Sequence, residues 1–138
     1  MPSLIVRRPV GILRIVTEDF KSKLIADLKE AAESVEMRIQ QIDFQTRGYI
    51  EQVQKSDIKR AMALKEQVAA EKRRHESLRG EILERLQEAE ALELDSEYEQ
   101  GHVESEIEIK EGDNITEVLG DAAIVVKDDV VIEIRGVK

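Results

Sequence analysis

The chain has 138 residues, with 30 acidic and 21 basic side chains that give a formal net charge of −9. Aromatic residues make up 3% of the sequence and tryptophan is absent, so the stacking platforms used by readers of single-stranded nucleic acid are scarce. Because the chain has no cysteine, a disulfide framework and a thiolate metal site are excluded. This composition fits a reducing compartment.

The most apolar stretch lies near the N-terminus. Arg7, Arg8 and Pro9 interrupt it, and neither piece approaches the roughly 18 residues of a membrane span. No basic segment precedes the apolar run and no small-residue cleavage site follows it. We therefore expect a cytoplasmic protein without membrane contact.

The charge divides the chain into three segments. Residues 1–17 carry three arginines, residues 18–92 carry 16 acids and 14 bases, and residues 93–138 carry 14 acids and 4 bases. We predict an N-terminal strand in 1–17 that joins a β-module, a coiled-coil helical region in 18–92, and an acidic small β-module in 93–138. The last segment would be repelled by a phosphate backbone.

The middle segment has no proline and carries apolar residues at three- and four-residue spacing, which predicts long helices. Thr17 is placed to cap the first helix, with Glu18 and Asp19 in its first turn. The spacing is typical of coiled-coil packing. The predicted apolar stripe consists of Leu24, Leu28, Ala31 or Ala32, Val35, Ile39, Ile42, Tyr49, Val53, Ile58, Met62, Val68, His75, Leu78, Ile82, Leu86 and Ala89.

Two geometries fit this pattern: one straight helix about 110 Å long, or an antiparallel hairpin with its turn near residues 54–57. We favour the hairpin, because its arms would be of similar length and would bring residue 92 back to the strand at 10–16. Ser56 and Asp57 can cap a second helix. Under either geometry we expect a homo-oligomer.

The remaining segments show strand patterns. Val103, Ile107 and Ile109 alternate with three glutamates, which predicts a strand with one acidic face and a bulge near Gly101. A hairpin closed on Asp128 and Asp129 would pair Val125 with Ile132 and Ala123 with Ile134. The predicted strands are 10–16, 97–109, 115–118, 121–127 and 130–135. The fold class is thus α+β: a long antiparallel coiled-coil helical hairpin with a small antiparallel β-barrel-like module built from the N-terminal strand and the C-terminal strands.

Three motifs together resemble the YlqD family of uncharacterised bacterial and plastid proteins: RPVGILRIVTEDF, IQQIDFQ in the helical region, and EIEIKEGDNI with IVVKDDVVIEIR near the C-terminus. The resemblance spans nearly the whole chain. It implies a fold type and no activity, and the position of some members beside ribosome-maturation genes implies an association with translation. The family usually has Asp-Gly where this chain has Asp128 and Asp129, and glycine adopts positive φ at lower cost.

No catalytic, cofactor-binding or metal-binding residues are predicted. His75 and His102 are the only histidines and lack partners at metal-ligand spacing, and phosphate-binding glycine motifs are missing. We therefore expect no enzyme and no cofactor. The candidate interaction residues are basic side chains; a cluster such as the one at 72–79 is more often a solvated helix face that pairs with nearby glutamates. They are Arg7, Arg8, Lys72, Arg73, Arg74 and Arg79.

Two functions remain. The first is a non-enzymatic protein–protein interaction or scaffold protein that binds an unknown protein partner through the coiled coil and the β-module. The second is a ribosome- or RNA-associated accessory factor that contacts phosphate through the helix and N-terminal arginines.

Overall fold

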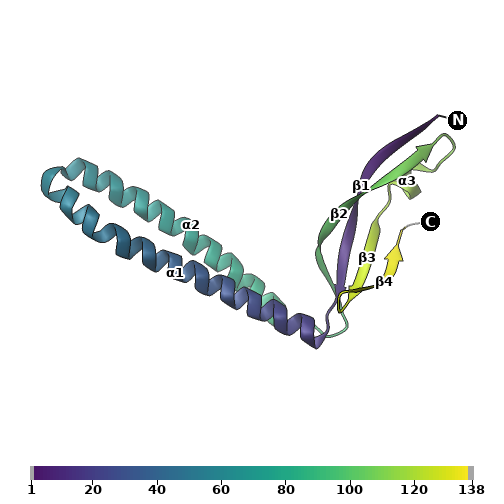
Figure 1. The fold of residues 1–138 in the computed structure, drawn as a ribbon, viewed down its shortest axis with the longest axis horizontal. Helices are drawn as coiled ribbons and strands as arrows, with labels where there is room; N and C mark the ends of the chain where they lie inside the picture. The colour runs from purple at the N-terminus through teal and green to yellow at the C-terminus, as the bar shows by residue number, and fades with distance from the viewer. Residues whose placement is uncertain (1, 137–138) are drawn as a thin grey trace. The chain divides into compact units, whose positions relative to one another are not determined.

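A computed structural model describes residues 2–136 (Figure 1). The chain divides into two compact units. Residues 22–91 form one unit, which is helical, and residues 1–21 and 92–138 form the other, whose described part is a sheet with a short helix. The fold is therefore α+β, as predicted, and each unit is described by itself.

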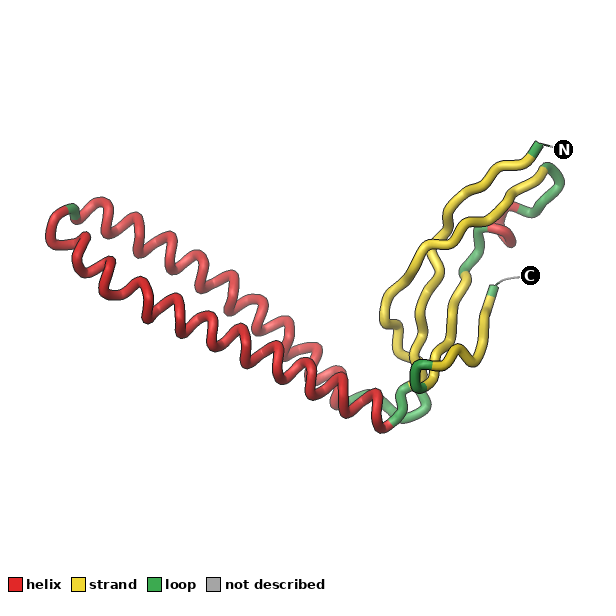
Figure 2. The backbone as a smooth tube through the Cα atoms, in the orientation of Figure 1, coloured by secondary structure: helices red, strands yellow, loops and turns green. Residues whose placement is uncertain are grey.

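The helical unit is an antiparallel hairpin. Helix α1 (Glu18–Ser56) and helix α2 (Ile58–Glu90) lie side by side with a single residue, Asp57, between them (Figures 1 and 2). Asp57 has extended backbone and its carboxylate accepts the amide hydrogen of Arg60 at 3.1 Å. This side chain caps α2, so the chain reverses here without glycine or proline.

The helices bury a narrow stripe against each other. Ile39, Ile42 and Ile50 of α1 and Ala61 and Ala89 of α2 are buried. Most of the remaining predicted stripe residues are half-buried. The coiled-coil packing itself stays a prediction.

The prediction of a buried stripe is wrong for four residues, because each of them leaves more than two fifths of its surface exposed. They are Tyr49, Ile58, Met62 and Leu78. In α1 the spacing from Ile42 continues through Thr46 to Ile50, which leaves Tyr49 at the flank. In α2 the small side chain of Ala61, 1% exposed, occupies the seam in place of its larger neighbours.

The other unit contains four strands, β1 (Ser3–Ile15), β2 (Glu97–Lys110), β3 (Ala122–Lys127) and β4 (Val130–Arg135). Their order in the sheet is β2-β1-β3-β4. The predicted antiparallel arrangement is wrong, because β1 and β3 are parallel. The sheet is not closed, and the predicted barrel-like shape is not confirmed. β3 follows the turn after β2 and so runs in the same direction as β1, which β2 opposes.

Local elements of this unit also differ from the prediction. β1 is a strand from residue 3 rather than 10, because it pairs with β2 along its whole length, Pro9 included. Residues 115–118, predicted as a strand, form the short helix α3 (Ile115–Val118). The side chain of Asn114 accepts the amide hydrogens of Thr116 and Glu117, and this cap outweighs the β-branched residues that favour a strand.

Both predicted irregularities occur in the sheet. The β1–β2 register shifts opposite residues 99–101, which confirms a bulge beside Gly101. The turn between β3 and β4 forms on Asp128 and Asp129, which adopt positive φ values of 48° and 65°. A second bulge leaves Ile132 without a partner, so Val125 pairs with Glu133 and Ala123 with Arg135, one residue later than predicted.

The core of the sheet unit is small. Val16 and Val125 are its only described residues with less than 2% exposure and a large apolar side chain. Val10, Ala122 and Val126 complete the buried apolar set. Most of the remaining sheet surface is therefore open to solvent or to partners.

Candidate interaction surfaces

Arg8, one of the predicted interaction residues, lies inside the sheet unit. It is 6% exposed and donates hydrogen bonds to the carbonyl oxygens of Val118, at 2.6 Å, and Gly136, at 3.4 Å. Val118 ends α3, where helix carbonyls are unpaired and favour a cation. Arg8 therefore fastens α3 and the end of β4 to β1. Its role is structural, and it does not project from a flexible arm.

The other five basic residues do not form one patch. Lys72 pairs with Asp43 at 2.7 Å, and Arg79 pairs with Glu36, so both join α2 to α1. Arg7 lies 3.7 Å from Glu104 on the neighbouring strand. Arg73 and Arg74 are exposed on α2. The sequence pattern could not separate these roles, because pairing partners 29 and 43 residues away decide them.

Arg8 also lines a groove of about 490 Å³ on one face of the sheet. Its apolar walls include Val10, Ile107 and Ile124. Glu106 and Glu117 lie at the same groove, so its charge is not simply positive. The Nε atom of Arg8 is buried without a hydrogen-bond partner among the described residues, and it has almost no surface that a ligand could reach.

The turn end of the hairpin, residues 44–65, exposes large apolar side chains that the predicted pattern did not assign to a surface. Phe44 is 87% exposed, Ile58 66% and Met62 65%. The same segment carries five basic residues and two acidic ones, a net charge of +3 within a chain of −9. Phe44 lies off the three- and four-residue stripe, which is the signal that identifies it as outward-facing.

The outer edge of β4 is a second exposed apolar surface. β4 ends the strand order, and every residue of the strand except Arg135 is exposed. Val130, Val131, Ile132 and Ile134 each expose more than half of their surface. The predicted hairpin located this strand, but only the sheet order shows that no further strand of the described chain covers it.

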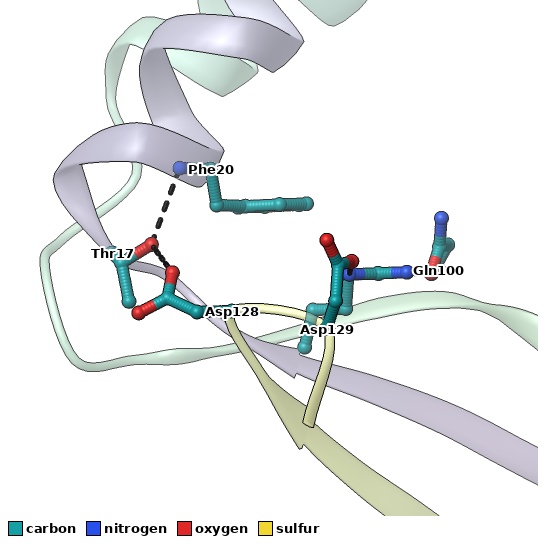
Figure 3. A network of polar contacts seen from close by, with 6 residues as sticks. Thr17, Phe20, Gln100, Asp128 and Asp129 are labelled. Atoms are coloured by element: carbon teal, nitrogen blue, oxygen red, sulfur yellow. Dashed lines mark hydrogen bonds and ion pairs between the residues drawn. The ribbon is translucent and has the colours of Figure 1, made fainter. Parts of the chain in front are cut away.

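Polar contacts hold the β3–β4 turn to the start of α1 (Figure 3). Thr17 donates its hydroxyl hydrogen to Asp128 at 2.9 Å and accepts the amide hydrogen of Phe20 at 3.2 Å, which confirms Thr17 as a helix cap. Arg14 pairs with Asp129 at 3.0 Å. The two aspartates that replace the usual Asp-Gly thus gain partners, and these contacts offset the cost of positive φ.

One ion pair changes the acid–base properties of the sheet. Arg135 donates two hydrogen bonds to Glu97, at 2.6 and 3.1 Å, and one to Glu133 at 3.1 Å. These bonds lower the pKa of Glu97 and raise the pKa of Arg135. Both side chains are accessible to water, so the pair contributes little to stability.

Within residues 2–136, no group of three or more histidine, aspartate or glutamate side chains is arranged to hold a metal ion. The helices in this part of the chain include none long and apolar enough to cross a membrane.

Comparisons with known proteins identify a family and a similar solved structure. No curated protein matches the chain. A crystal structure of a protein of unknown function from Synechococcus sp. WH 8102 is similar, with a TM-score of 0.85 and 25% sequence identity over 97% of this chain and 95% of that one. The model of the family described as YlqD protein matches residues 4–135. The chain belongs to the YlqD family.

Proposed function

We propose that this protein is a non-enzymatic interaction protein that binds another protein through the turn end of its helical hairpin. The observation that carries the proposal is the exposure of Phe44, 87%, on a helix whose buried stripe is already filled. An exposed phenylalanine costs free energy in water, and clusters of such residues are typical of docking surfaces. Ile58 and Met62 of α2 are exposed in the same 44–65 segment.

The charge of this segment indicates the partner's chemistry. Residues 44–65 carry Arg47, Lys55, Lys59, Arg60 and Lys65 against Glu51 and Asp57. A positive end on a negative chain steers toward an acidic surface. We infer a protein partner with an apolar patch surrounded by acidic residues.

A groove of the hairpin is lined in part by residues of this segment. It measures about 360 Å³ and runs between α1 and α2 beside residues 44–65, with Ile50, Val68 and Ala69 among its lining residues. The Lys72–Asp43 pair lies at its other end. A partner side chain can enter this groove while the exposed apolar residues contact the surface around it.

RNA is the alternative partner. The charge of the chain and the type of its exposed side chains favour RNA less than a protein. Phosphate contacts would draw on a segment of net charge +3 in a chain of −9. The exposed aliphatic side chains of Ile58 and Met62 do not stack on bases. The experiment below separates RNA from protein.

The test is affinity capture from cell extract at near-physiological salt, with the full chain as bait. We expect a protein partner that survives RNase treatment and is lost with the double variant Phe44→Ser, Met62→Ser. The matched control is Leu83→Ser, which removes a 43% exposed apolar residue elsewhere on α2 and should leave capture intact.

Recovery of the bait alone would contradict the proposal. RNase-sensitive capture of ribosomal particles would replace it with the RNA-associated function. Far-UV circular dichroism of each variant confirms that the hairpin remains folded, which we expect because both substituted positions are exposed.

A further inference from the structure

The residues of β4 are typical of a strand that pairs with another strand at its free edge. Edge strands of monomeric proteins are usually protected by charge, proline or a covering segment. β4 instead presents four exposed apolar residues, and its two charged residues, Glu133 and Arg135, are bonded to each other at 3.1 Å. The edge is therefore apolar and close to neutral, and nothing on it repels a second strand.

The opposite edge of the sheet favours a particular partner. β2 carries Glu104, Glu106 and Glu108 on one face, and the basic residue of the neighbouring β1 on that face is Arg7, which pairs with Glu106. Pairing β2 with β2 of another copy would bring like charges together, and pairing β2 with β4 would be head-to-tail and would not close. Only β4 against β4 is both closed and free of acidic repulsion.

We propose that β4 pairs antiparallel with β4 of a second copy of this chain, about a two-fold axis. The surface lies on the sheet unit, so the proposal does not depend on docking at the hairpin. It accounts for Val130, Val131, Ile132 and Ile134 together. It gives one continuous sheet made from two four-stranded sheets.

The contacts of β4 with β3 show which β4 side chains share a face. Val131 pairs with Val126 and Ile134 pairs with Ile124. Since residues 124 and 126 lie on the same face of β3, Val131 and Ile134 also share a face, and the bulge absorbs Ile132 between them. In the two-fold pair, Val131 of one copy lies opposite Ile134 of the other, which forms two equivalent apolar contacts.

Charge makes the association depend on salt in a diagnostic direction. Residues 1–21 carry four bases and two acids, and residues 92–138 carry four bases and 14 acids, so this unit has a net charge of −8. Two such units repel each other, and salt screens the repulsion. The dimer should therefore tighten as salt rises, whereas binding to a nucleic acid would weaken.

The experiment is sedimentation equilibrium of the full chain over a range of concentrations and salt. A six-residue strand makes a small interface, so we expect a dimer with a dissociation constant above about 1 μM. Val131→Lys or Ile134→Glu should each weaken association at least about tenfold, because a charge then faces an apolar residue. The matched control, Leu4→Lys, places the same charge on a 66% exposed residue of β1 and should change nothing.

Mixing the two variants tests the register. In a dimer of one Val131→Lys chain with one Ile134→Glu chain, lysine lies opposite glutamate at one contact and the wild-type pair remains at the other. Association should recover most of the lost tenfold in the mixture and in neither variant alone. Amide hydrogen exchange should show added protection in β4 at high concentration.

Three outcomes would overturn the proposal: a wild-type chain that stays monomeric at the highest concentration, a dimer unchanged by both β4 variants, and a mixture that does not associate better than its components. A dimer lost with Phe44→Ser but not with the β4 variants would place self-association on the hairpin instead. Circular dichroism and exchange protection of β1 check that the variants are folded.

Discussion

The helical hairpin and the sheet unit differ in how they bury apolar side chains. The hairpin buries Ile39, Ile42, Ile50, Ala61 and Ala89 between two neighbouring segments of chain, and its exposed apolar residues lie outside this narrow stripe. The sheet unit buries few side chains and leaves a whole edge strand uncovered. The hairpin therefore covers its stripe with its own two helices, whereas the sheet leaves an apolar edge strand exposed.

The largest expected effect comes from removing a buried side chain in the middle of the hairpin stripe. Ile42→Ala should lower the free energy of unfolding of the helical unit by about 3 kcal/mol, because Ile42 is 4% exposed and its loss leaves a cavity. Urea denaturation followed by circular dichroism at the helix band measures the change. The control, Phe44→Ala, removes a larger side chain that is 87% exposed and should cost within about 0.5 kcal/mol. Equal losses would show that the stripe is misassigned.

The sheet should respond to a smaller deletion at one of its few buried positions. Val125→Ala should cost about 2 kcal/mol, the transfer of two methyl groups plus a small cavity, since Val125 is 1% exposed. Native-state hydrogen exchange of the amides in β1 and β3 measures it. Val131→Ala on the exposed edge serves as the control and should leave exchange of the monomer unchanged. Loss of protection in α1 and α2 as well would show that the two units unfold together.

The turn of the hairpin depends on a single cap. Asp57→Ala should destabilise the hairpin by about 1 kcal/mol, because the amide of Arg60 loses its acceptor. Asp57→Asn keeps an acceptor oxygen and should destabilise the hairpin by only about a few tenths of a kcal/mol. Thermal unfolding of the two variants side by side gives the difference, and equal effects would mean that charge rather than capping acts here.

The smallest expected effect concerns Glu97 and its pH dependence. Arg135 lowers the pKa of Glu97, so the carboxylate stabilises the sheet above its ordinary value of 4.5 and loses this contribution as pH falls through the lowered pKa. Glu97→Gln should therefore be slightly less stable than wild type at neutral pH and indistinguishable from it in strong acid. A stability difference that grows on acidification would reverse the assigned sign.

Much of the fold follows from local sequence. Apolar spacing gives the two long helices, Asp57 and Thr17 give their starts, and alternation in 103–109 gives the β2 strand. Each of these features depends on residues within a few positions of one another, so propensity and periodicity suffice. The family resemblance is likewise confirmed by the match over residues 4–135.

The candidate site was less accessible from sequence. The six candidate residues are all basic, yet their surroundings differ. Arg8 is buried and bonded to the end of α3, and Lys72 and Arg79 form ion pairs with α1. Arg73 and Arg74 are exposed to solvent. Partners that are far away in the sequence determine whether each basic residue is buried, paired or exposed. The pattern of charges along the chain does not identify those partners. Phe44 lies off the predicted stripe, whereas Met62 belongs to it, so only the structure shows that Met62 is exposed.

The sequence by itself determined the two long helices, the residues at which a turn between them would fall, and the apolar alternation of β2, because each of these depends on neighbours along the chain. Only the tertiary structure decided that β3 lies parallel to β1, that the sheet stays open, and that β4 has a free edge. Those features arise from pairing between residues more than 100 positions apart, such as Val10 with Ala122. Such long-range pairing is selected by the packing of the whole unit and leaves no local signature.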